Sequence, residues 1–599
     1  MGTAENGAAT WKSDLALALL AALFAFAVDA WAGFGQLTDA GGDNDNLLRL
    51  VEVRDLLAGQ GWFDLHQYRM GLEGGFVMHW SRLVDAPIAM ITLAASALTG
   101  SEPLGEDVAQ VLWPALLFWS TLFFTARAAR SFGGGGAVLP AILVGAAGYY
   151  FIGIYDPGAL DHHNVQLMLT MASLALLLEA PARRWAALLS GLCAALTLAI
   201  GMETVPYVGT IGVCVSLLFV ADPGGERAIA RDFGLGFAGV AALVFVTTVS
   251  PSTWGAAQCD AFSVAQFVVA AIGGVGLAAI ASVEPAAGSW RRRLASLAVL
   301  GVVLGVVVVA LFPQCLSAPY ASLDPRLKEL WLDHVDEAQS LFTLLVRDPA
   351  RVAARYATPL VAIILMALRL RRGGWRRQDS LVAALLAVAF VVGAWQVRGT
   401  TFSIAFAVVP LSAWIAKWRA RAESGSSLGV ALRLAAVWLV SINPVWTGVA
   451  AAASVAFEKG KAVADGGTTD KTCEKKASFA PLGGMAATTV LTISNLGAPV
   501  LAYSGHRVFA GPYHRDIAGN LLVLDAFLGS ADDARAIVEA HRVGLIAICP
   551  GNVETMILTR KAPQGFLAGL LRGSVPEWLE PVSGSKGSPI SLYRVRQAG

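Results

Sequence analysis

The sequence predicts a polytopic α-helical membrane protein with a small α/β domain at its C-terminal end. Hydrophobic residues make up 56% of the 599 residues, charged residues only 15%, and the mean hydropathy is +0.61. This composition excludes a large soluble enzyme. The formal net charge is only +1, but lysines and arginines gather in short segments between long apolar runs. Such basic segments mark the cytoplasmic ends of membrane helices.

The apolar runs predict about 13 transmembrane helices, because each run is about 17 to 25 residues long and can cross a bilayer. They lie at 14–34, 108–126, 137–154, 164–180, 185–201, 205–221, 233–250, 263–282, 294–313, 355–371, 380–396, 400–416 and 428–447. No small-residue cleavage site follows the first run, which therefore reads as an uncleaved span. An odd number of crossings puts the N-terminus in the cytoplasm and the C-terminal tail outside. We expect a multi-pass protein of a bacterial cytoplasmic (inner) membrane.

Three external segments remain once the spans are placed. The transmembrane part, 1–449, carries external loops at 35–107 and 314–354, and 450–599 is expected to form a periplasmic domain. The apolar stretch 86–98 would break the alternation of charge if it crossed the bilayer, so we expect it to lie on the outer surface. Chemistry is therefore expected at the outer face.

The first external loop is rich in aspartate directly beyond the first span. Asp39, Asp43 and Asp45 would repel one another unless a cation lies among them. A divalent metal ion satisfies that need. The same run of Asp and Asn also favours turns, so a solvated acidic loop is the alternative.

A polar segment at 155–164 ends an apolar run and carries two carboxylates and two imidazoles. Asp161 and His163 are two residues apart, so on an extended loop both side chains can turn toward one cation. A carboxylate oxygen together with an imidazole suits Mn²⁺ or Mg²⁺. In the alternative interpretation, Asp161 caps the helix that is predicted to begin at Asn164.

Charged residues elsewhere on the outer side extend this pattern. Glu337 lies in an acidic group of the later loop, which could equally be the exposed face of a short helix. Arg398 stands alone between two apolar spans, where an arginine usually has an anionic partner, either an internal carboxylate or a phosphate on a ligand. Glu203 lies near an outer helix end and is either a residue behind the metal ligands or a hydrogen-bonded structural glutamate.

The tail is predicted to fold as a small α/β domain, because short β-type runs accompany a helical pattern. The expected strands lie at 488–493, 500–503, 507–510 and 543–549, and the expected helix lies at 531–540. The segment 511–515, Gly-Pro-Tyr-His-Arg, follows a predicted strand. It is either an ordered turn or a contact to an anionic acceptor or donor.

Four of the six cysteines fall in external segments. Cys259 and Cys315 lie in outer loops, and Cys473 and Cys549 lie in the tail. Two disulfides are therefore plausible in an oxidising compartment.

The topology and the motifs together resemble the GT-C glycosyltransferases, and within them the catalytic subunits of oligosaccharyltransferases from eukaryotes, archaea and bacteria. Those proteins have the same number of spans, a cytoplasmic N-terminus and an external C-terminal domain. Their first external loop carries an Asp followed six residues later by an Arg, as Asp43 and Arg49 do. Their second external loop carries an acidic motif that reads Asp-His-His in archaeal members, which Asp161, His162 and His163 match.

The resemblance extends to the later external positions. A Glu in a mobile loop of the family corresponds to Glu337, and an Arg that opens a late span and contacts the donor's phosphates corresponds to Arg398. The resemblance implies that Asp43, Asp161 and His163 hold Mn²⁺ or Mg²⁺, with Glu337 approaching the same centre. The candidate catalytic residues are Asp43, Asp45 and Glu337, and the secondary candidates are Asp156, His162, Arg49 and Glu203.

One feature of the oligosaccharyltransferases is missing. No Trp-Trp-Asp motif, which reads the Asn-x-Ser/Thr sequon in that family, follows the last predicted span. We therefore expect metal-dependent transfer of a sugar from a polyprenyl phosphate or diphosphate donor to a glycan, lipid or protein acceptor at the outer face.

Two other functions stay open at the level of sequence. One is an N-oligosaccharyltransferase with a divergent acceptor site. The other is a membrane transporter, whose charged site would lie near the bilayer midplane rather than at the outer face. The sequence contains no phosphate-binding loop, dinucleotide fingerprint or basic-aromatic surface for nucleic acid.

Overall fold

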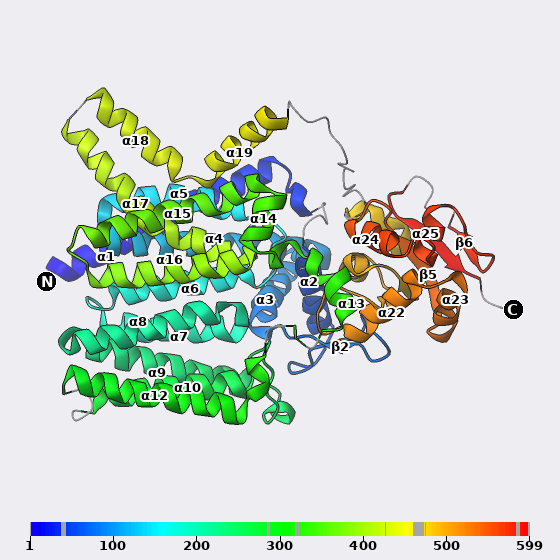
Figure 1. The fold of residues 1–599 in the computed structure, drawn as a ribbon, viewed down its shortest axis with the longest axis horizontal. Helices are drawn as coiled ribbons and strands as arrows, with labels where there is room; N and C mark the ends of the chain where they lie inside the picture. Colours follow the sequence, from blue (N-terminus) through cyan, green and yellow to red (C-terminus); the bar gives the residue numbers. More distant parts are fainter. Residues whose placement is uncertain are drawn as a thin grey trace.

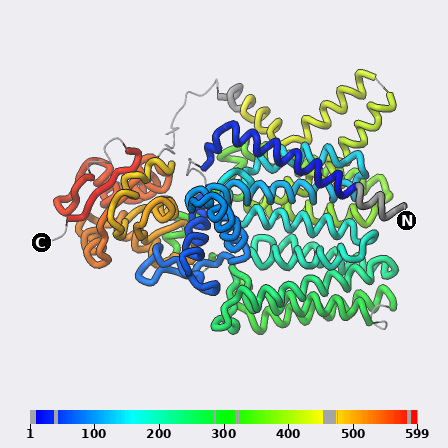
Figure 2. The backbone as a smooth tube through the Cα atoms, turned by 180° about the vertical axis from the view of Figure 1, so that it is seen from behind, coloured from blue at the N-terminus to red at the C-terminus, as the bar shows by residue number. Residues whose placement is uncertain are grey.

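Long helices lie side by side in a bundle, and a smaller domain that contains a β-sheet covers one end of it (Figure 1). The computed structural model describes residues 2–37, 43–283, 288–317, 320–321, 323–425, 427–458, 473, 475–582 and 588–596. The N-terminus lies at the end of the bundle opposite the small domain (Figure 2). Asp39, one of the aspartates predicted to face the cation, lies outside the described residues.

Each predicted span coincides with a helix of the bundle, and the last span coincides with a bent pair. The helices are α1 (Gly2–Trp31), α4 (Glu102–Gly133), α5 (Val138–Ile152), α6 (His163–Glu179), α7 (Arg184–Ile200), α8 (Val205–Ala221), α9 (Pro223–Thr248), α10 (Val264–Ser282), α12 (Trp290–Leu311), α15 (Pro349–Arg371), α16 (Arg377–Trp395), α17 (Thr400–Ser424), α18 (Leu428–Val440) and α19 (Asn443–Glu458). The pair α18 and α19 is bent by 86°. Helix α19 also continues past 449, the boundary predicted for the transmembrane part.

By length and apolarity, fewer of the described helices than the predicted 13 qualify as membrane-crossing, and they include one helix that was not predicted to cross. Among the described residues, 11 helices are long and apolar enough to cross, or 12 if the bent pair is one span. Helices α6 and α7 have only 17 residues each, yet both lie within the bundle. Helix α3 (Arg82–Thr99), predicted to lie on the surface, is itself long and apolar enough to cross. It lies with α2 (Asn44–Leu57) at the end of the bundle that faces the small domain (Figure 1).

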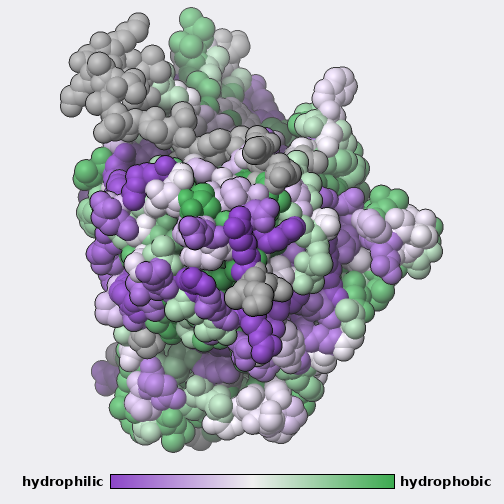
Figure 3. Space-filling view, turned by 90° about the vertical axis from the view of Figure 1, so that its right-hand side faces the viewer, coloured by the Kyte–Doolittle hydropathy of each residue, from purple (hydrophilic) through white to green (hydrophobic). Residues whose placement is uncertain are grey.

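The sides of the bundle are apolar, whereas the end that carries the small domain is polar. Along α12, Val299, Val302 and Val306 are 63%, 65% and 59% exposed. Exposed apolar side chains on a long helix suit contact with lipid. Figure 3 views the end that carries the small domain, where hydrophilic residues cover much of the surface.

A buried ion cluster ties α1 to α4 and α6 within the bundle. The guanidinium of Arg127 donates to Asp14 at 2.8 Å and to Glu179 at 2.6 Å. Arg130 donates to both oxygens of the same aspartate, which is completely buried. Charges buried in this way persist only when they are paired and hydrogen-bonded.

The two predicted external loops do not stand apart from the C-terminal domain but share its hydrophobic core. The first loop contains α2, a two-stranded antiparallel hairpin of β1 (His66–Gln67) and β2 (Phe76–Val77), and α3. The later loop contains α13 (Pro325–Leu330) and α14 (Leu341–Arg347). Leu48, Val51, Met70, Phe76, Met78, Trp80, Leu327 and Leu330 from these loops belong to the core of the C-terminal domain.

The C-terminal domain is an α/β fold around a five-stranded sheet. The strand order is β4 (Arg507–Val508), β3 (Thr489–Leu491), β5 (Val543–Ile548), β7 (Ser591–Val595) and β6 (Leu579–Pro581). The first three strands are parallel, and the last two run antiparallel to their neighbours. The helices are α20 (Ala480–Gly483), α21 (Gly497–Tyr503), α22 (Ile517–Leu528), α23 (Ala531–Ala540), α24 (Val553–Lys561) and α25 (Phe566–Leu571).

One of the strands predicted in the tail is wrong. The stretch 500–503 belongs to helix α21, while the strands predicted at 488–493, 507–510 and 543–549 and the helix at 531–540 are present. Val500 and Leu501 are fully buried, so the short apolar run shows no periodicity that separates a helix from a strand. Pro499 lies in the first turn of α21, where proline is tolerated.

Both expected cysteine pairs are disulfide-bonded. Cys259, in the loop between α9 and α10, is joined to Cys315, which follows α12. Cys473 is joined to Cys549, at the end of β5. The first bond therefore links two loops at the domain-facing end of the bundle. The second links the start of the C-terminal domain to the end of its strand β5.

The ion cluster in the bundle can be tested by removing its central cation. Arg127→Ala leaves Asp14 and Glu179 buried without this partner, and such a loss costs about 3–5 kcal/mol. The purified variant should unfold at a clearly lower temperature than the wild type. The matched control is Arg535→Ala, which breaks the exposed pair with Glu539, a pair worth about 0.3–0.5 kcal/mol. Equal unfolding temperatures for the two variants would contradict the structural role of the cluster.

Candidate functional site

The acidic residues of the first loop meet the Asp-His-His segment where α2 and α6 begin. Asp43 is the N-cap of α2, and its Oδ1 accepts a hydrogen bond from the backbone of Asp45 at 3.0 Å. Asn46, in the first turn of α2, accepts hydrogen bonds from the backbone N–H groups of Leu160 and Asp161, both at 2.8 Å. This amide therefore holds the two acidic segments against each other.

Asp43, Asp45 and Asp161 form a cluster of carboxylates that could hold a cation. Each offers one oxygen, and these oxygens all lie within 4.8 Å of one another. Burial, followed by the charges of Asp161 and Glu337, raises the pKa of Asp43 to about 7. Burial and the neighbouring carboxylates also raise the pKa of Asp45 well above its usual value. A cation relieves such crowding, and an all-oxygen donor set fits Mg²⁺ or Mn²⁺.

The cluster differs in one member from the predicted metal ligands. Asp45, predicted as a catalytic residue, takes the third place, and His163 lies beside the cluster with its Nε2 3.4 Å from Oδ2 of Asp161. Asp161 does not cap α6, as one interpretation of the sequence proposed. Helix α6 begins at His163, and its N-cap is His162 without a side-chain cap. The Asp161 carboxylate instead accepts from the backbone N–H of the adjacent His162. This carboxylate remains available to a ligand.

The two histidines differ in their surroundings. The Nδ1 of His162 lies 2.6 Å from Oδ1 of Asp161, and both side chains are buried. Burial opposes the charge of each group, but the charges of His162 and His163 hold the pKa of Asp161 well below its usual range. Against the effect of burial, Asp161 and Glu203 raise the pKa of His162 to about 10. Both shifts have the same cause, the close approach of the His162 ring to the Asp161 carboxylate.

Glu203 orients the histidines from behind. It accepts a hydrogen bond from Gln166 at 3.2 Å, and the Gln166 oxygen lies 3.2 Å from Nδ1 of His163. These contacts orient the His163 ring, whose Nε2 lies near Oδ2 of Asp161. Glu203 also lies 3.7 Å from Nε2 of His162.

Arg49 supports the site from within the protein core. Its guanidinium is completely buried, donates to Asp85 at 2.7 Å and lies 3.5 Å from Glu52. It also lies over the ring of Trp80, 4.2 Å from the centroid, and this ring in turn neighbours His162 with 6.1 Å between centroids. Arg49 thus joins α2 to α3 and packs against the Trp80 ring, which lies next to His162.

Asp156, one of the secondary candidates, is not part of the carboxylate cluster. It lines a pocket between α1, α4 and α5 with Asp29, Tyr150 and Tyr155. Burial and the charge of Asp29 raise the pKa of Asp156 to about 6. The structure therefore separates this carboxylate from the three that meet at α2 and α6.

Glu337 and Arg398 approach the cluster from the later loop and from the start of α17. Glu337 is exposed on the short 3-10 helix η7 (Asp336–Ala338). It interacts electrostatically with Asp43, Asp45 and Arg398. Arg398 lies on η8 (Val397–Gly399) and donates to Gln396 at 2.9 Å. Within the described part of the chain, no carboxylate lies within ion-pair distance of Arg398.

Sequence reasoning missed Arg355, a second guanidinium in this region. It is half-buried near the start of α15 and donates to Thr400 at 3.2 Å. It too has no carboxylate within ion-pair distance among the described residues, and the charge of Glu337 reaches it. The signal was an arginine at the outer end of a predicted span, which is the same signal that singled out Arg398.

The C-terminal domain also reaches the site. The hydroxyl of Tyr513 donates to the backbone oxygen of Asn44 at 3.1 Å, between two of the clustered aspartates. Burial, followed by the charges of Asp45 and Asp43, raises the pKa of Tyr513 well above its usual value. Part of the segment 511–515 is thus both an ordered turn and a contact to the acidic region.

No protein-family model matches the chain, and no curated protein sequence matches it significantly. Similar solved structures include the archaeal oligosaccharyltransferase AglB from Archaeoglobus fulgidus in complex with an inhibitory peptide and a dolichol-phosphate. The TM-score is 0.64 and the sequence identity is 16%, and the match covers 89% of this chain and 69% of that chain. The A. fulgidus enzyme tethered to an acceptor peptide with the NVT sequon has a TM-score of 0.63 and 15% identity over 96% and 73% of the two chains. Its complex with zinc and sulfate has a TM-score of 0.59 and 14% identity over 89% and 67%. The chain therefore has the GT-C fold of the membrane glycosyltransferases, with a sheet-containing domain at its C-terminal end.

Proposed function

We propose that the protein transfers a sugar from a polyprenyl phosphate or diphosphate donor to an acceptor at the outer face of the cytoplasmic membrane. The observation that carries this proposal is the carboxylate cluster of Asp43, Asp45 and Asp161. Arg398, which has no carboxylate within ion-pair distance among the described residues, lies nearby. Both lie at the end of a bundle of apolar helices, where a lipid-linked substrate can arrive laterally. Solved structures of the same fold are oligosaccharyltransferases, one of them in complex with a dolichol-phosphate.

The residues at the site divide the chemistry between them. A divalent cation bound to Asp43, Asp45 and Asp161 would stabilise the negative charge that develops on the leaving phosphate. Arg398 would bind the phosphate through charge-assisted hydrogen bonds, because no carboxylate in the described residues lies within ion-pair distance of it. Direct displacement at the anomeric carbon inverts its configuration, and a carboxylate of this group takes the proton from the acceptor. Glu337 is the exposed carboxylate that can approach from the later loop.

The acceptor is the part of the reaction for which the chain departs from the oligosaccharyltransferases. Because no Trp-Trp-Asp motif follows the last span, we propose a glycan or lipid acceptor ahead of a protein sequon. A sequon peptide, a lipid extract and a glycan extract offered to the same donor-loaded protein separate these classes. Transfer to the peptide would instead assign the protein as an N-oligosaccharyltransferase with a divergent acceptor site.

The metal ligands can be tested without knowing the substrate. Asp161→Ala removes one of three clustered carboxylates and should weaken Mn²⁺ binding more than about 100-fold, beyond the loss typical of residues behind the ligands. Mn²⁺ binding is measured by electron paramagnetic resonance on the chelator-treated protein. Asp156→Ala is the matched control, because this aspartate lies in a separate pocket, and it should bind Mn²⁺ like the wild type. Unchanged binding by Asp161→Ala would refute the metal site.

The phosphate role of Arg398 can be tested with the donor alone. Arg398→Ala should lower the affinity for a polyprenyl-phosphate-linked sugar by about 10- to 100-fold, since a hydrogen bond to a charged group is worth about 1.5–3 kcal/mol. Binding of radiolabelled donor to protein in nanodiscs measures this change. The control is Arg351→Ala, whose guanidinium pairs with the exposed Asp336 at 3.1 Å. Equal donor affinity in both variants would remove the assigned role.

A further inference from the structure

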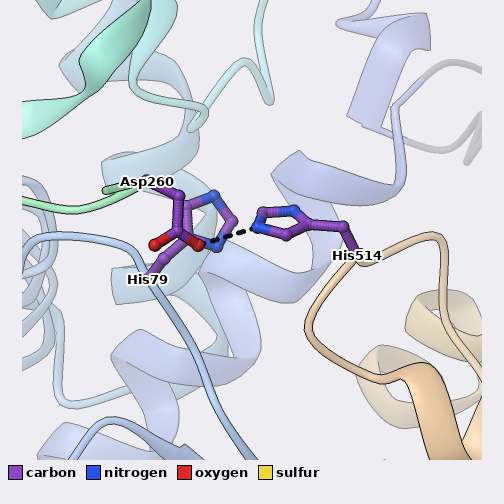
Figure 4. Close-up of side chains that lie close together, drawn as sticks. All are labelled: His79, Asp260 and His514. Carbon is purple, nitrogen blue, oxygen red and sulfur yellow. Dashed lines mark hydrogen bonds and ion pairs between the residues drawn. The ribbon is translucent and has the colours of Figure 1, made fainter. Parts of the chain in front are cut away.

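A second group of ligand-type side chains lies apart from the carboxylate cluster. His79 comes from the first loop between β2 and α3, Asp260 from the loop between α9 and α10, and His514 from the C-terminal domain before α22. Each offers one ligand atom, and these atoms lie within 4.8 Å of one another. Figure 4 shows the two imidazoles gathered around the carboxylate.

Hydrogen bonds within the protein account for only part of this cluster. His514 Nε2 lies 2.8 Å from Oδ2 of Asp260. The ring of His79 lies tilted against that of His514, with 4.7 Å between centroids. His79 makes no hydrogen bond to any residue that the structure describes, and its Nδ1 is buried without a partner. A buried polar atom left unsatisfied costs about 1–3 kcal/mol and calls for an explanation such as a bound ion.

The carboxylate is held in place from behind. Arg515 donates to both oxygens of Asp260 at 2.7 Å and to Gln258 at 3.0 Å. The neighbouring residue, Cys259, is fixed by its disulfide to Cys315. Carboxylates that bind metals are commonly oriented by such additional donors. The three side chains are thus presented on anchored segments.

The chemistry of the group differs from that of the carboxylate cluster. Two imidazoles and one carboxylate favour Zn²⁺ and related late first-row metals over Mg²⁺. In a tetrahedral site with bonds of about 2.0–2.2 Å, ligand atoms lie about 3.3–3.6 Å apart. His514 and Asp260 lie closer than that, with 2.8 Å between Nε2 and Oδ2, and all three ligand atoms lie within 4.8 Å of one another. Binding an ion therefore requires the His514–Asp260 pair to separate by about 0.5–0.8 Å.

We propose that His79, Asp260 and His514 bind a transition-metal ion such as Zn²⁺, which joins the first loop, the loop between α9 and α10, and the C-terminal domain. The fourth position is left to water or to a group of a substrate, as in zinc sites with three protein ligands. The ion takes the place of the hydrogen bond between His514 and Asp260 and gives the His79 ring a partner. Arg515 remains bound to the outer side of the carboxylate.

The test uses the full chain, purified in detergent and stripped of metal with a chelator. Co²⁺ serves as the probe, because its visible absorption reports tetrahedral ligands that include nitrogen. Wild type and Asp161→Ala should both show the cobalt band, since the carboxylate cluster is not needed for it. His514→Ala should lower Co²⁺ affinity at least about ten-fold. Zn²⁺ should displace Co²⁺ from the wild type and raise its unfolding temperature.

Two further variants keep the test decisive. His79→Gln removes a ligand that makes no hydrogen bond in the described chain, so it should fold normally and still lose the cobalt band. His66→Ala is the matched control, because His66 forms another histidine–aspartate pair, 2.8 Å from Asp64, without a second imidazole ligand, and it should bind Co²⁺ like the wild type. A cobalt band absent from the wild type, or retained in both His79→Gln and His514→Ala, would overturn the proposal and leave an ion-pair cluster only.

Discussion

Negative charge gathered where α2 and α6 begin is the constraint on which the rest of the site depends. Asp43, Asp45 and Asp161 approach one another in a partly buried region, and uncompensated charge there is costly. The protein supplies positive charge on the helix side through His162 and, behind it, Arg49. Asp43 and Asp45 have no basic side chain within ion-pair distance among the described residues. A bound cation would therefore have to balance the negative charge of Asp43 and Asp45.

The same constraint explains why the C-terminal domain is built into the site. In the described part of the chain, the acidic first loop forms no hydrophobic core of its own. Leu48 and Val51 of α2 instead pack into the hydrophobic core of the C-terminal domain. Arg54 and Arg69 donate to backbone carbonyls of that domain. These contacts fix the start of α2, and therefore Asp43, relative to the bundle.

The sequence predicted the bundle and the two disulfides, because apolar length and compartment each leave a local signal. The meeting of Asp43 with Asp161 was implied by the resemblance to the glycosyltransferases. The sequence did not predict the helix at 500–503, since a fully buried apolar run has no periodicity to read. Nor did it group His79 with Asp260, because these residues lie far apart in the chain and are brought together only by tertiary structure. The bend between α18 and α19 likewise interrupts an apolar run that appears continuous in sequence.

The disulfide between Cys259 and Cys315 sets an order of events in the life of the chain. It joins the loop after α9 to the loop after α12, so both helices must be inserted before the bond can form. Oxidation also requires enzymes that work outside the cytosol. In the orientation proposed above, the Asp260 segment is anchored only after translocation, and the C-terminal domain, which is synthesised after it, meets a surface that is already fixed. Maturation would run from membrane insertion through oxidation to docking, and a chain held in a reducing compartment would stop at the second step.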